Sequence, residues 1–251
     1  MFKLRALVNE IQGDGPKAIF MAGPAGAGKS FILKKLNIDG FKTINVDDDF
    51  EELLQKELGK SDFASMSPEE LSTAGKLMGT ARKTTREKEI ASVESLQNIV
   101  IDGTGAASRP LLKKKAELES LGYKTFMILI YVSPMTSLKR NADRGRSLPT
   151  SAVLSSWKGL SSNIAIYRDE FDDDIIVINN DPEDVDKSYN PEIIRKSFPS
   201  PKGKPKSPEE IEKSKAKKEQ LNIEIKELLD AEREFDTFDE AKTKVASFVN
   251  A

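Results

Sequence analysis

Short apolar runs and longer amphipathic stretches alternate along the first 180 residues of this chain. The apolar runs are rich in Ile, Val, Phe and Met, as buried strands are, and the stretches between them have the length of helices. The predicted strands are residues 18–21, 43–46, 99–101, 125–132 and 175–178. Five strands alternating with helices predict an α/β fold, with a five-stranded parallel sheet and helices on both of its faces.

The segments between these strands have the sequence features of helices. Helices are expected over residues 29–36, from about 50 onward, and over 67–96, 109–121, 133–144 and 150–171. The start at Ser67 is the clearest, because Ser67 and Glu70 form a capping box and Pro68 takes the first helical position.

The composition changes after Asn180. The residues that follow are rich in Pro, Lys, Asp and Ser, which is typical of a linker. A second capping box, at Ser207 and Glu210, then begins another helical region. We therefore expect a main domain over residues 1–180, a linker over 181–206 and a C-terminal helical extension over 207–251.

The segment Gly23–Ser30 fits the pattern G-x-x-x-x-G-K-[ST] at every fixed position. Its glycines would let several backbone N–H groups face phosphate oxygens, and the helix that follows would offer its positive N-terminal end. Lys29 would reach the β- and γ-phosphates of ATP, and the Ser30 hydroxyl would bind Mg²⁺. The alternative is a glycine-rich turn that only caps a helix. The residues expected to bind the nucleotide are Gly23, Gly26, Ala27, Gly28, Lys29, Ser30 and Phe31, together with Arg140.

Acidic residues follow the second and third predicted strands. Asp47, Asp48 and Asp49 end the second strand, where one of them could accept the proton of a substrate hydroxyl, and helix capping is their alternative role. Asp102 follows three β-branched residues, as a carboxylate that helps to hold Mg²⁺ does, and an Asp-Gly turn is its alternative role. Thr104 and Asp47 are candidate contacts to the substrate.

Arginines gather after the fourth predicted strand. Arg140 and Arg144 share one helix face at i,i+4, where like charges repel unless an anion lies between them. A triphosphate would supply that anion, and guanidinium groups stabilise charge on a transferred phosphoryl group. Gly145 and Pro149 suit a mobile lid segment. Arg109 is a further candidate contact to the substrate.

The chain has no Cys and no His. These absences exclude disulfides, thiolate nucleophiles, Cys/His zinc sites and histidine general-base chemistry. Any bound metal would need oxygen ligands, which favours Mg²⁺.

The net charge is only −2, which does not indicate a nucleic-acid-binding protein. A lysine-rich stretch over 202–218 could still bind nucleic acid, or form a solvated helix with Glu–Lys pairs. No apolar run approaches the roughly 20 residues of a membrane span, and no signal-peptide pattern is seen, so we expect a cytoplasmic location. The oligomeric state stays open.

Together these segments resemble the kinase domain of phage polynucleotide 5′-hydroxyl kinases and, more loosely, zeta-toxin and chloramphenicol-phosphotransferase-like kinases. The resemblance implies a P-loop NTPase fold and is compatible with a phage origin. Asp48-Asp49-Phe50 resembles an Asp-Asp-aromatic segment whose first Asp is the general base, which implies that role for Asp48. The two lid arginines of the family carry over to Arg140 and Arg144. The resemblance covers about residues 17–180 in patches, namely 23–30, 48–50, 101–105, 138–145, 149, 153–154 and 157–158.

Two departures from the family leave the phosphoryl acceptor open. Glu51 stands where the polynucleotide kinase has an Arg that contacts the substrate phosphate. Residues 56–96 form a longer helical insertion on the substrate side, and zeta toxins, which phosphorylate a nucleotide sugar, also have an enlarged substrate region. The candidate acceptors are a 5′-hydroxyl polynucleotide, a nucleoside or nucleotide, and a nucleotide sugar.

The expected function is therefore ATP-dependent transfer of the γ-phosphoryl group to a substrate hydroxyl, with ATP and Mg²⁺ as cofactors. One alternative is an NTP-hydrolysing switch, although the sequence has no clear Asp-x-x-Gly switch signature. The other is a non-catalytic scaffold that binds ATP, which the intact Lys29, Ser30 and Asp48 disfavour.

Overall fold

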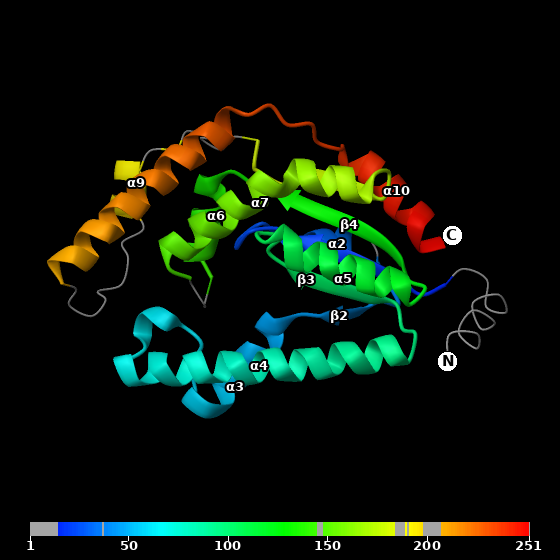
Figure 1. Cartoon of the computed structure of the whole chain (residues 1–251), viewed down its shortest axis with the longest axis horizontal. Coiled ribbons are helices and arrows are strands. Elements are labelled where there is room, and N and C mark those ends of the chain that lie inside the picture. The colour runs from blue at the N-terminus through cyan, green and yellow to red at the C-terminus, as the bar shows by residue number, and fades with distance from the viewer. Residues whose placement is uncertain are drawn as a thin grey trace.

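The computed structural model describes residues 15–36, 38–144, 148–183, 189, 191–197 and 207–250. It confirms the α/β fold, with five parallel strands in one sheet in the order β2-β3-β1-β4-β5 (Figure 1). The strands are β1 (Lys17–Ala22), β2 (Lys42–Ile44), β3 (Ile99–Gly103), β4 (Lys124–Tyr131) and β5 (Ile175–Asn179).

Helices precede and follow the strands and lie close to the predicted ranges. They are α2 (Lys29–Lys35), α3 (Val46–Leu58), the short 3₁₀ helix η1 (Phe63–Ser65), α4 (Pro68–Glu94), α5 (Ser108–Ser120), α6 (Pro134–Ala142), α7 (Thr150–Phe171), α8 (Pro191–Ser197), α9 (Pro208–Asp230) and α10 (Phe238–Asn250). Within the range expected to be a linker, α8 is helical, whereas residues 184–188, 190 and 198–206 lie outside the described residues. Residues 1–14 of the expected main domain also lie outside them.

Alternate residues of each strand face opposite sides of the sheet, and helices cover both sides. On one side Phe20 and Ala22 of β1 pack with α5 and α7, and on the other side Ile19 and Met21 pack with α2 and α10. Because β1 and β4 are buried on both sides, they form nearly continuous apolar runs in the sequence.

α3 and α4 form a helical pair beside the edge strand β2 (Figure 1). Their contact has its own hydrophobic cluster, which includes Phe50 and Leu54 of α3 and Ala81 of α4. A salt bridge of 2.6 Å between Glu89 of α4 and Lys114 of α5 connects the pair to the helices on the sheet. The pair is thus packed as a unit and meets the rest of the fold at β2 and α5.

The C-terminal residues cover one edge and part of one face of the sheet. The N–H of Asp236 donates to the Val177 carbonyl at 2.8 Å, and its carboxylate accepts from the Val177 N–H at 2.7 Å, which satisfies part of the edge of β5. α10 then packs on the same side as α2, where the rings of Phe248 and Phe126 lie 4.9 Å apart. α10 is therefore part of the main core, whereas α9 packs on α7 on the opposite side.

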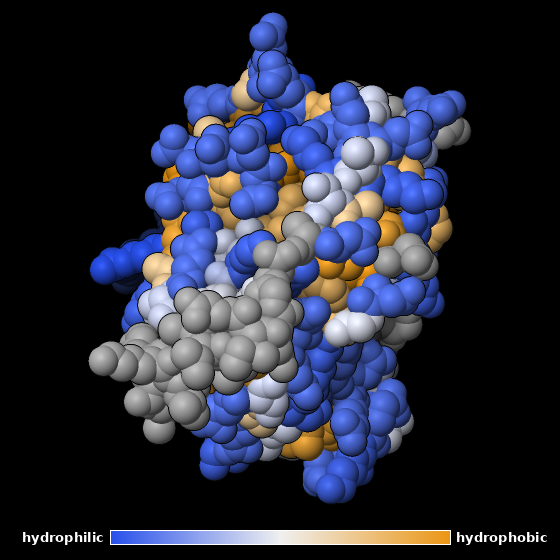
Figure 2. Space-filling model, turned by 90° about the vertical axis from the view of Figure 1, so that its right-hand side faces the viewer, coloured by the Kyte–Doolittle hydropathy of each residue, from blue (hydrophilic) through white to orange (hydrophobic). Residues whose placement is uncertain are grey.

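The side of the molecule seen in Figure 2, where the strands begin, is covered mainly by hydrophilic residues, with hydrophobic residues visible between them. Among the helices in the described part of the chain, none combines the length and the apolar character that a membrane crossing requires.

Replacing Phe248 tests whether α10 belongs to the core. Phe248 is 8% exposed and fills the space over β4, so Phe248→Ala should lower the free energy of unfolding by about 3 kcal/mol in urea denaturation. Ile223→Ala on α9 is the control, because Ile223 is 48% exposed and its loss should change the free energy of unfolding by only about 0.5 kcal/mol. Equal midpoints for the two variants would contradict the packing of α10.

Candidate functional site

The segment Gly23–Ser30 forms a tight loop between β1 and α2, at the carboxyl end of the sheet. Gly26 and Gly28 have φ angles of 76° and 84°, a conformation that residues with side chains rarely adopt. A β carbon at Gly28 would also lie only 2.6 Å from Asn180 Nδ2. Gly28 is the N-cap of α2, so the positive end of that helix opens into this phosphate loop.

Helix α6 anchors two carbonyl groups of the phosphate loop. Ser137 is fully buried, and its Oγ donates to the Ala25 carbonyl at 2.6 Å. Arg140 Nη1 donates to the Gly26 carbonyl at 3.3 Å. These contacts hold the loop against α6 and fix its shape.

Asn180, directly after β5, anchors a third carbonyl. Its Nδ2 donates to the Ala27 carbonyl at 2.8 Å, and its own carbonyl accepts from Arg140 Nη2 at 3.0 Å. Three consecutive carbonyls of the loop are thus held by protein side chains, so the curl needed to bind phosphate is formed before a nucleotide arrives.

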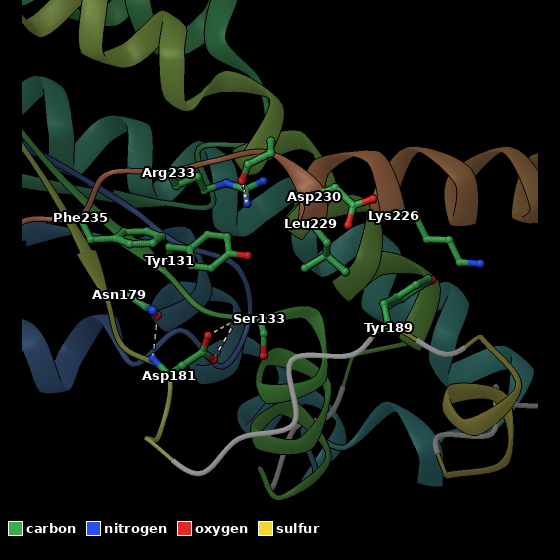
Figure 3. A pocket seen from close by; sticks show the side chains of 11 residues that line it. Tyr131, Ser133, Asn179, Asp181, Tyr189, Lys226, Leu229, Asp230, Arg233 and Phe235 are labelled. Carbon is green, nitrogen blue, oxygen red and sulfur yellow. Dashed lines mark hydrogen bonds between the residues drawn. The ribbon is translucent and has the colours of Figure 1, made fainter.

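A cavity of about 480 Å³ lies next to these anchors, between the ends of β4 and β5 and residues 226–235 (Figure 3). The Asp181 carboxylate accepts from the Ser133 N–H at 2.8 and 2.9 Å, and the Asp181 N–H donates to Asn179 Oδ1 at 3.1 Å (Figure 3). These bonds set the start of α6 relative to the end of β5. None of the predicted site residues lines this cavity.

Lys29 and Asp102 form a charge pair beside the phosphate loop. Lys29 Nζ donates to the Gly23 carbonyl at 3.1 Å and lies 3.7 Å from Asp102 Oδ1. Burial raises the pKa of Asp102, Lys29 opposes that rise, and the nearby carboxylates of Asp47 and Asp48 add to it. A further cation near this carboxylate would stabilise its charged form.

Asp102 and Ser30 fit a Mg²⁺ ion that is bound together with a nucleotide. Asp102 Oδ1 is buried and has no hydrogen-bond partner among the residues that the structure describes, and Ser30 lies exposed in the first turn of α2. Within the same residues, no three acidic side chains gather into a metal site of their own. Because Mg²⁺ commonly combines one or two protein ligands with water and phosphate oxygens, these two residues are a suitable set.

Asp47, Asp48 and Asp49 lie in the first turn of α3, which corrects the expectation that they end the second strand. Asn45 is the reason, because its Oδ1 accepts from the Asp47 N–H at 2.9 Å and caps the helix one residue before Val46. The helix therefore starts earlier than the hydrophobic pattern alone predicts.

The surroundings of Asp49 differ from those of Asp47 and Asp48. Asp49 is buried, and its carboxylate accepts hydrogen bonds from Thr85 and Lys88 of α4. Burial alone would raise the pKa of Asp49, but the bonds from Lys88 and Thr85 outweigh burial and lower it. Asp47 and Asp48 are exposed. Asp49 thus joins α3 to α4, which leaves its two neighbours as the candidate general bases.

Asn45 connects this first turn to β3. Its Nδ2 donates to Asp102 Oδ2 at 3.1 Å and to Asp48 Oδ1 at 3.3 Å. A single amide group therefore sets the candidate base Asp48 relative to the candidate metal ligand Asp102.

The two arginines of the predicted lid differ in position. Arg140 lies within α6 and bonds to the phosphate loop, whereas Arg144 follows α6 and is exposed. Gly145 lies in 145–147, outside the described residues. Two hydrogen bonds join Asn141, near the end of α6, to Leu148, and we call this pair the base of the lid. Asn141 Nδ2 donates to the Leu148 carbonyl at 2.9 Å, and the Leu148 N–H donates to Asn141 Oδ1 at 3.0 Å.

Thr104 and Arg109 lie after the end of β3, on the same edge of the sheet as Asp102. Thr104 is exposed, and its Oγ1 accepts from the Ala106 N–H at 3.3 Å. Arg109 is exposed in the first turn of α5. Phe31, expected near the nucleotide, is 60% exposed on α2.

Three neutral residues that shape the site were missing from the sequence-based predictions: Asn45, Ser137 and Asn180. Each has a hydrogen-bond partner that is distant in the sequence, 57 residues away for Asn45, 112 for Ser137 and 153 for Asn180. One signal could have found two of them, because Asn45 and Asn180 directly follow strands of a parallel sheet, where ligands bind.

Replacing Gly28 tests the preformed loop. Gly28→Ala should lower the affinity for ATP at least about tenfold, because the added β carbon meets Asn180 and the φ angle is strained. Gly59→Ala is a matched control, since Gly59 also has a positive φ of 66° but has no atom within 4 Å of the added carbon. Isothermal titration calorimetry with ATP and Mg²⁺ would measure both, and equal affinities would contradict the loop geometry.

Replacing Asn45 tests its bridge between the two carboxylates. Asn45→Ala should raise the Mg²⁺ concentration needed for half-maximal ATP binding about tenfold, because Asp102 loses the group that orients it. Ser67→Ala is the control, because it removes the N-cap of α4. It should lower the free energy of unfolding by about 1 kcal/mol, as loss of the Asn45 cap should, but leave the Mg²⁺ requirement unchanged. A shift of the same size in both variants would mean that Asn45 serves only as a cap.

Solved structures share this fold at low sequence identity. A crystal structure of an AvrRxo1-ORF1:-ORF2 complex matches with a TM-score of 0.50 and 17% identity over 91% of this chain and 84% of that chain. The same complex with ATP matches with a TM-score of 0.50 and 16% identity over 95% and 82%. The PezAT toxin–antitoxin system of Streptococcus pneumoniae matches with a TM-score of 0.46 and 18% identity over 91% and 95%. No curated protein matches significantly.

The family assignment comes from the sequence itself. The zeta toxin family matches residues 5–190, a range that contains the phosphate loop, the aspartates of α3, Arg140 of α6 and Arg144 after it. The match confirms the resemblance to zeta-toxin-like kinases and the P-loop NTPase fold, and supports the likeness to phage polynucleotide kinase only loosely. The chain belongs to the zeta toxin family.

Proposed function

We propose that this protein is an ATP-dependent kinase that transfers the γ-phosphoryl group of ATP to a hydroxyl group of its substrate. The observation that carries the proposal is the Asn45 bridge, which sets Asp48 beside the Lys29–Asp102 pair at the phosphate loop. Membership in the zeta toxin family supports it, and a structural neighbour has been solved with ATP.

The phosphate loop and the first turn of α2 would hold the triphosphate. The loop amides and the positive end of α2 face phosphate oxygens, and Lys29 reaches the β- and γ-phosphates. Mg²⁺ held by Ser30 and Asp102 would neutralise charge on those phosphates. Arg140 and Arg144 would add positive charge near the transferred group when the lid lies over the nucleotide.

Asp48 is the proposed general base. It is exposed, and its hydrogen bond from Asn45 fixes the carboxylate near Asp102. The substrate oxygen attacks the γ-phosphorus in line, its proton passes to Asp48, and ADP leaves without a covalent enzyme intermediate. Asp47 is the second candidate, and the hydrogen bonds of Asp49 to α4 make that residue unsuitable.

The acceptor side of the site would be formed by Asp47, Thr104 and Arg109, with the α3–α4 pair beside them. The acceptors that suit such a site are 5′-hydroxyl polynucleotides, nucleosides or nucleotides, and nucleotide sugars. Each has a primary or secondary hydroxyl that can attack the γ-phosphorus once a carboxylate takes its proton.

Transfer of label from [γ-³²P]ATP to a panel of these acceptors tests the proposal. Asp48→Asn should keep ATP binding and lower the transfer rate by about 10²–10⁴-fold, because the substrate proton has no acceptor. Lys29→Ala should lose both binding and transfer. Asp39→Asn is the control, since Asp39 is an exposed aspartate in the connection before β2 and should transfer at the wild-type rate.

Other outcomes would redirect the assignment. A wild-type rate in Asp48→Asn would pass the base role to Asp47. Hydrolysis of ATP without label on any acceptor would favour an NTP-hydrolysing switch, and ATP binding without either reaction would favour a scaffold.

A further inference from the structure

The loop after β3, residues 104–107, is held by two side chains of α7. We call it the acceptor loop because it contains Thr104. Tyr167 Oη donates to the Gly105 carbonyl at 2.8 Å. Asn163 Nδ2, one helical turn earlier, donates to the same carbonyl at 3.3 Å and to the Ala106 carbonyl at 3.2 Å. Two neutral side chains of one helix therefore bind the carbonyl groups of the two residues that follow Thr104.

Close packing prevents the acceptor loop from shifting toward α7. Gly105 has a φ of 66°, and a β carbon there would lie 2.7 Å from both Ala22 Cβ and Leu160 Cδ1. A β carbon at Gly159 of α7 would lie 2.7 Å from the Ala106 carbonyl oxygen. Helix and loop are in direct contact, so the position of α7 determines the position of the loop.

The hydroxyl of Tyr167 has a role that packing alone does not explain. Tyr167 is fully buried, and burial raises its pKa to about 12, with Asn163 opposing the rise. A tyrosine hydroxyl is protonated at neutral pH with or without this rise, and the geometry shows that it donates to the Gly105 carbonyl. A phenylalanine would fill nearly the same volume, but the Gly105 carbonyl would lose the hydrogen bond from the tyrosine hydroxyl.

We propose that Asn163 and Tyr167 are positioning residues for the phosphoryl acceptor, because they fix the loop from which Thr104 contacts it. The proposal rests on the kinase function proposed above, in which Thr104 lies on the acceptor side. The phosphate loop is held by α6 and Asn180 instead, so nucleotide binding does not depend on these two residues.

α7 also relates the acceptor loop to the start of α6. The helix begins at Thr150, shortly after the lid segment, and Trp157 Nε1 donates to the Val132 carbonyl at 2.6 Å, next to the start of α6. The same helix thus contacts the residue that precedes α6 by two positions and, farther along, the acceptor loop. The acceptor loop therefore has a defined place relative to the start of α6.

Steady-state kinetics with the acceptor identified by the label-transfer panel test this role. Tyr167→Phe and Asn163→Ala should each raise the KM for the acceptor about tenfold and leave the KM for ATP within about twofold. Tyr123→Phe is a matched control, because Tyr123 is also a buried tyrosine whose hydroxyl donates to a backbone carbonyl, that of Gln97 at 3.0 Å. It lies just before β4 begins, at the opposite end of the sheet, and should change neither KM.

A double-mutant cycle separates positioning from simple stabilisation. Thr104→Ala should lower kcat/KM for the acceptor in the wild-type background and much less in the Tyr167→Phe background, because a displaced Thr104 contributes less. In the Tyr123→Phe background, Thr104→Ala should lower kcat/KM for the acceptor as much as it does in the wild type. Independent effects of Thr104→Ala and Tyr167→Phe, or an equal rise of both KM values, would overturn the proposal.

Hydrogen–deuterium exchange distinguishes failure of this inference from failure of the kinase function. Peptides covering residues 103–107 should exchange faster in Tyr167→Phe than in the wild type, and at the wild-type rate in Tyr123→Phe. If no acceptor takes label, the kinase function fails and exchange alone decides whether α7 positions the loop. Equal exchange in Tyr167→Phe and the wild type would overturn that role.

Discussion

The fixed shape of the phosphate loop depends on where its carbonyl groups are bound. The carbonyl oxygens of Ala25, Gly26 and Ala27 each accept a hydrogen bond from a side chain of α6 or from Asn180, directly after β5. These elements are far apart in the sequence but meet at the carboxyl edge of a parallel sheet, because every strand of such a sheet ends there. The sheet order, with β1 between β3 and β4, thus places the loop between its anchors and Asp102.

The charges of the site are arranged around a carboxylate that is costly to bury. Among the residues that the structure describes, Asp102 lies near the cation Lys29 and accepts from the neutral donor Asn45, while Asp47 and Asp48 add negative charge. This excess of negative charge suits a site that receives a metal ion with its nucleotide, since the ion would restore the balance. The lowered pKa of Asp49, by contrast, reflects a completed set of partners on α4.

Most of the fold could be predicted because local sequence patterns indicate its strands, helices and phosphate loop. β1 and β4 are continuous apolar runs, α4 has a capping box at Ser67, and the glycines of the phosphate loop stand at fixed spacing. Charged candidates for the site could be named from the sequence because they lie within such a motif, as Lys29 does, or at the end of a predicted strand, as Asp102 does. The bridges that Asn45, Asn163 and Asn180 make to Asp102, Gly105 and Ala27 could not be predicted, because neutral amides are common and these partners lie 57 residues or more away in the sequence. The separate role of Asp49 depends on the register of α3 against Thr85, which no local pattern contains.

The place of α10 has a consequence for how the chain reaches its native state on the ribosome. Phe248 and Val245 complete the layer over Phe126 on the same side as α2, although 119 or more positions in the sequence separate them from Phe126. While residues 238–250 are still being synthesised or remain in the exit tunnel, that side of the sheet exposes apolar surface to solvent. The nascent protein would therefore be vulnerable to aggregation, or dependent on a chaperone, until translation of this segment is finished.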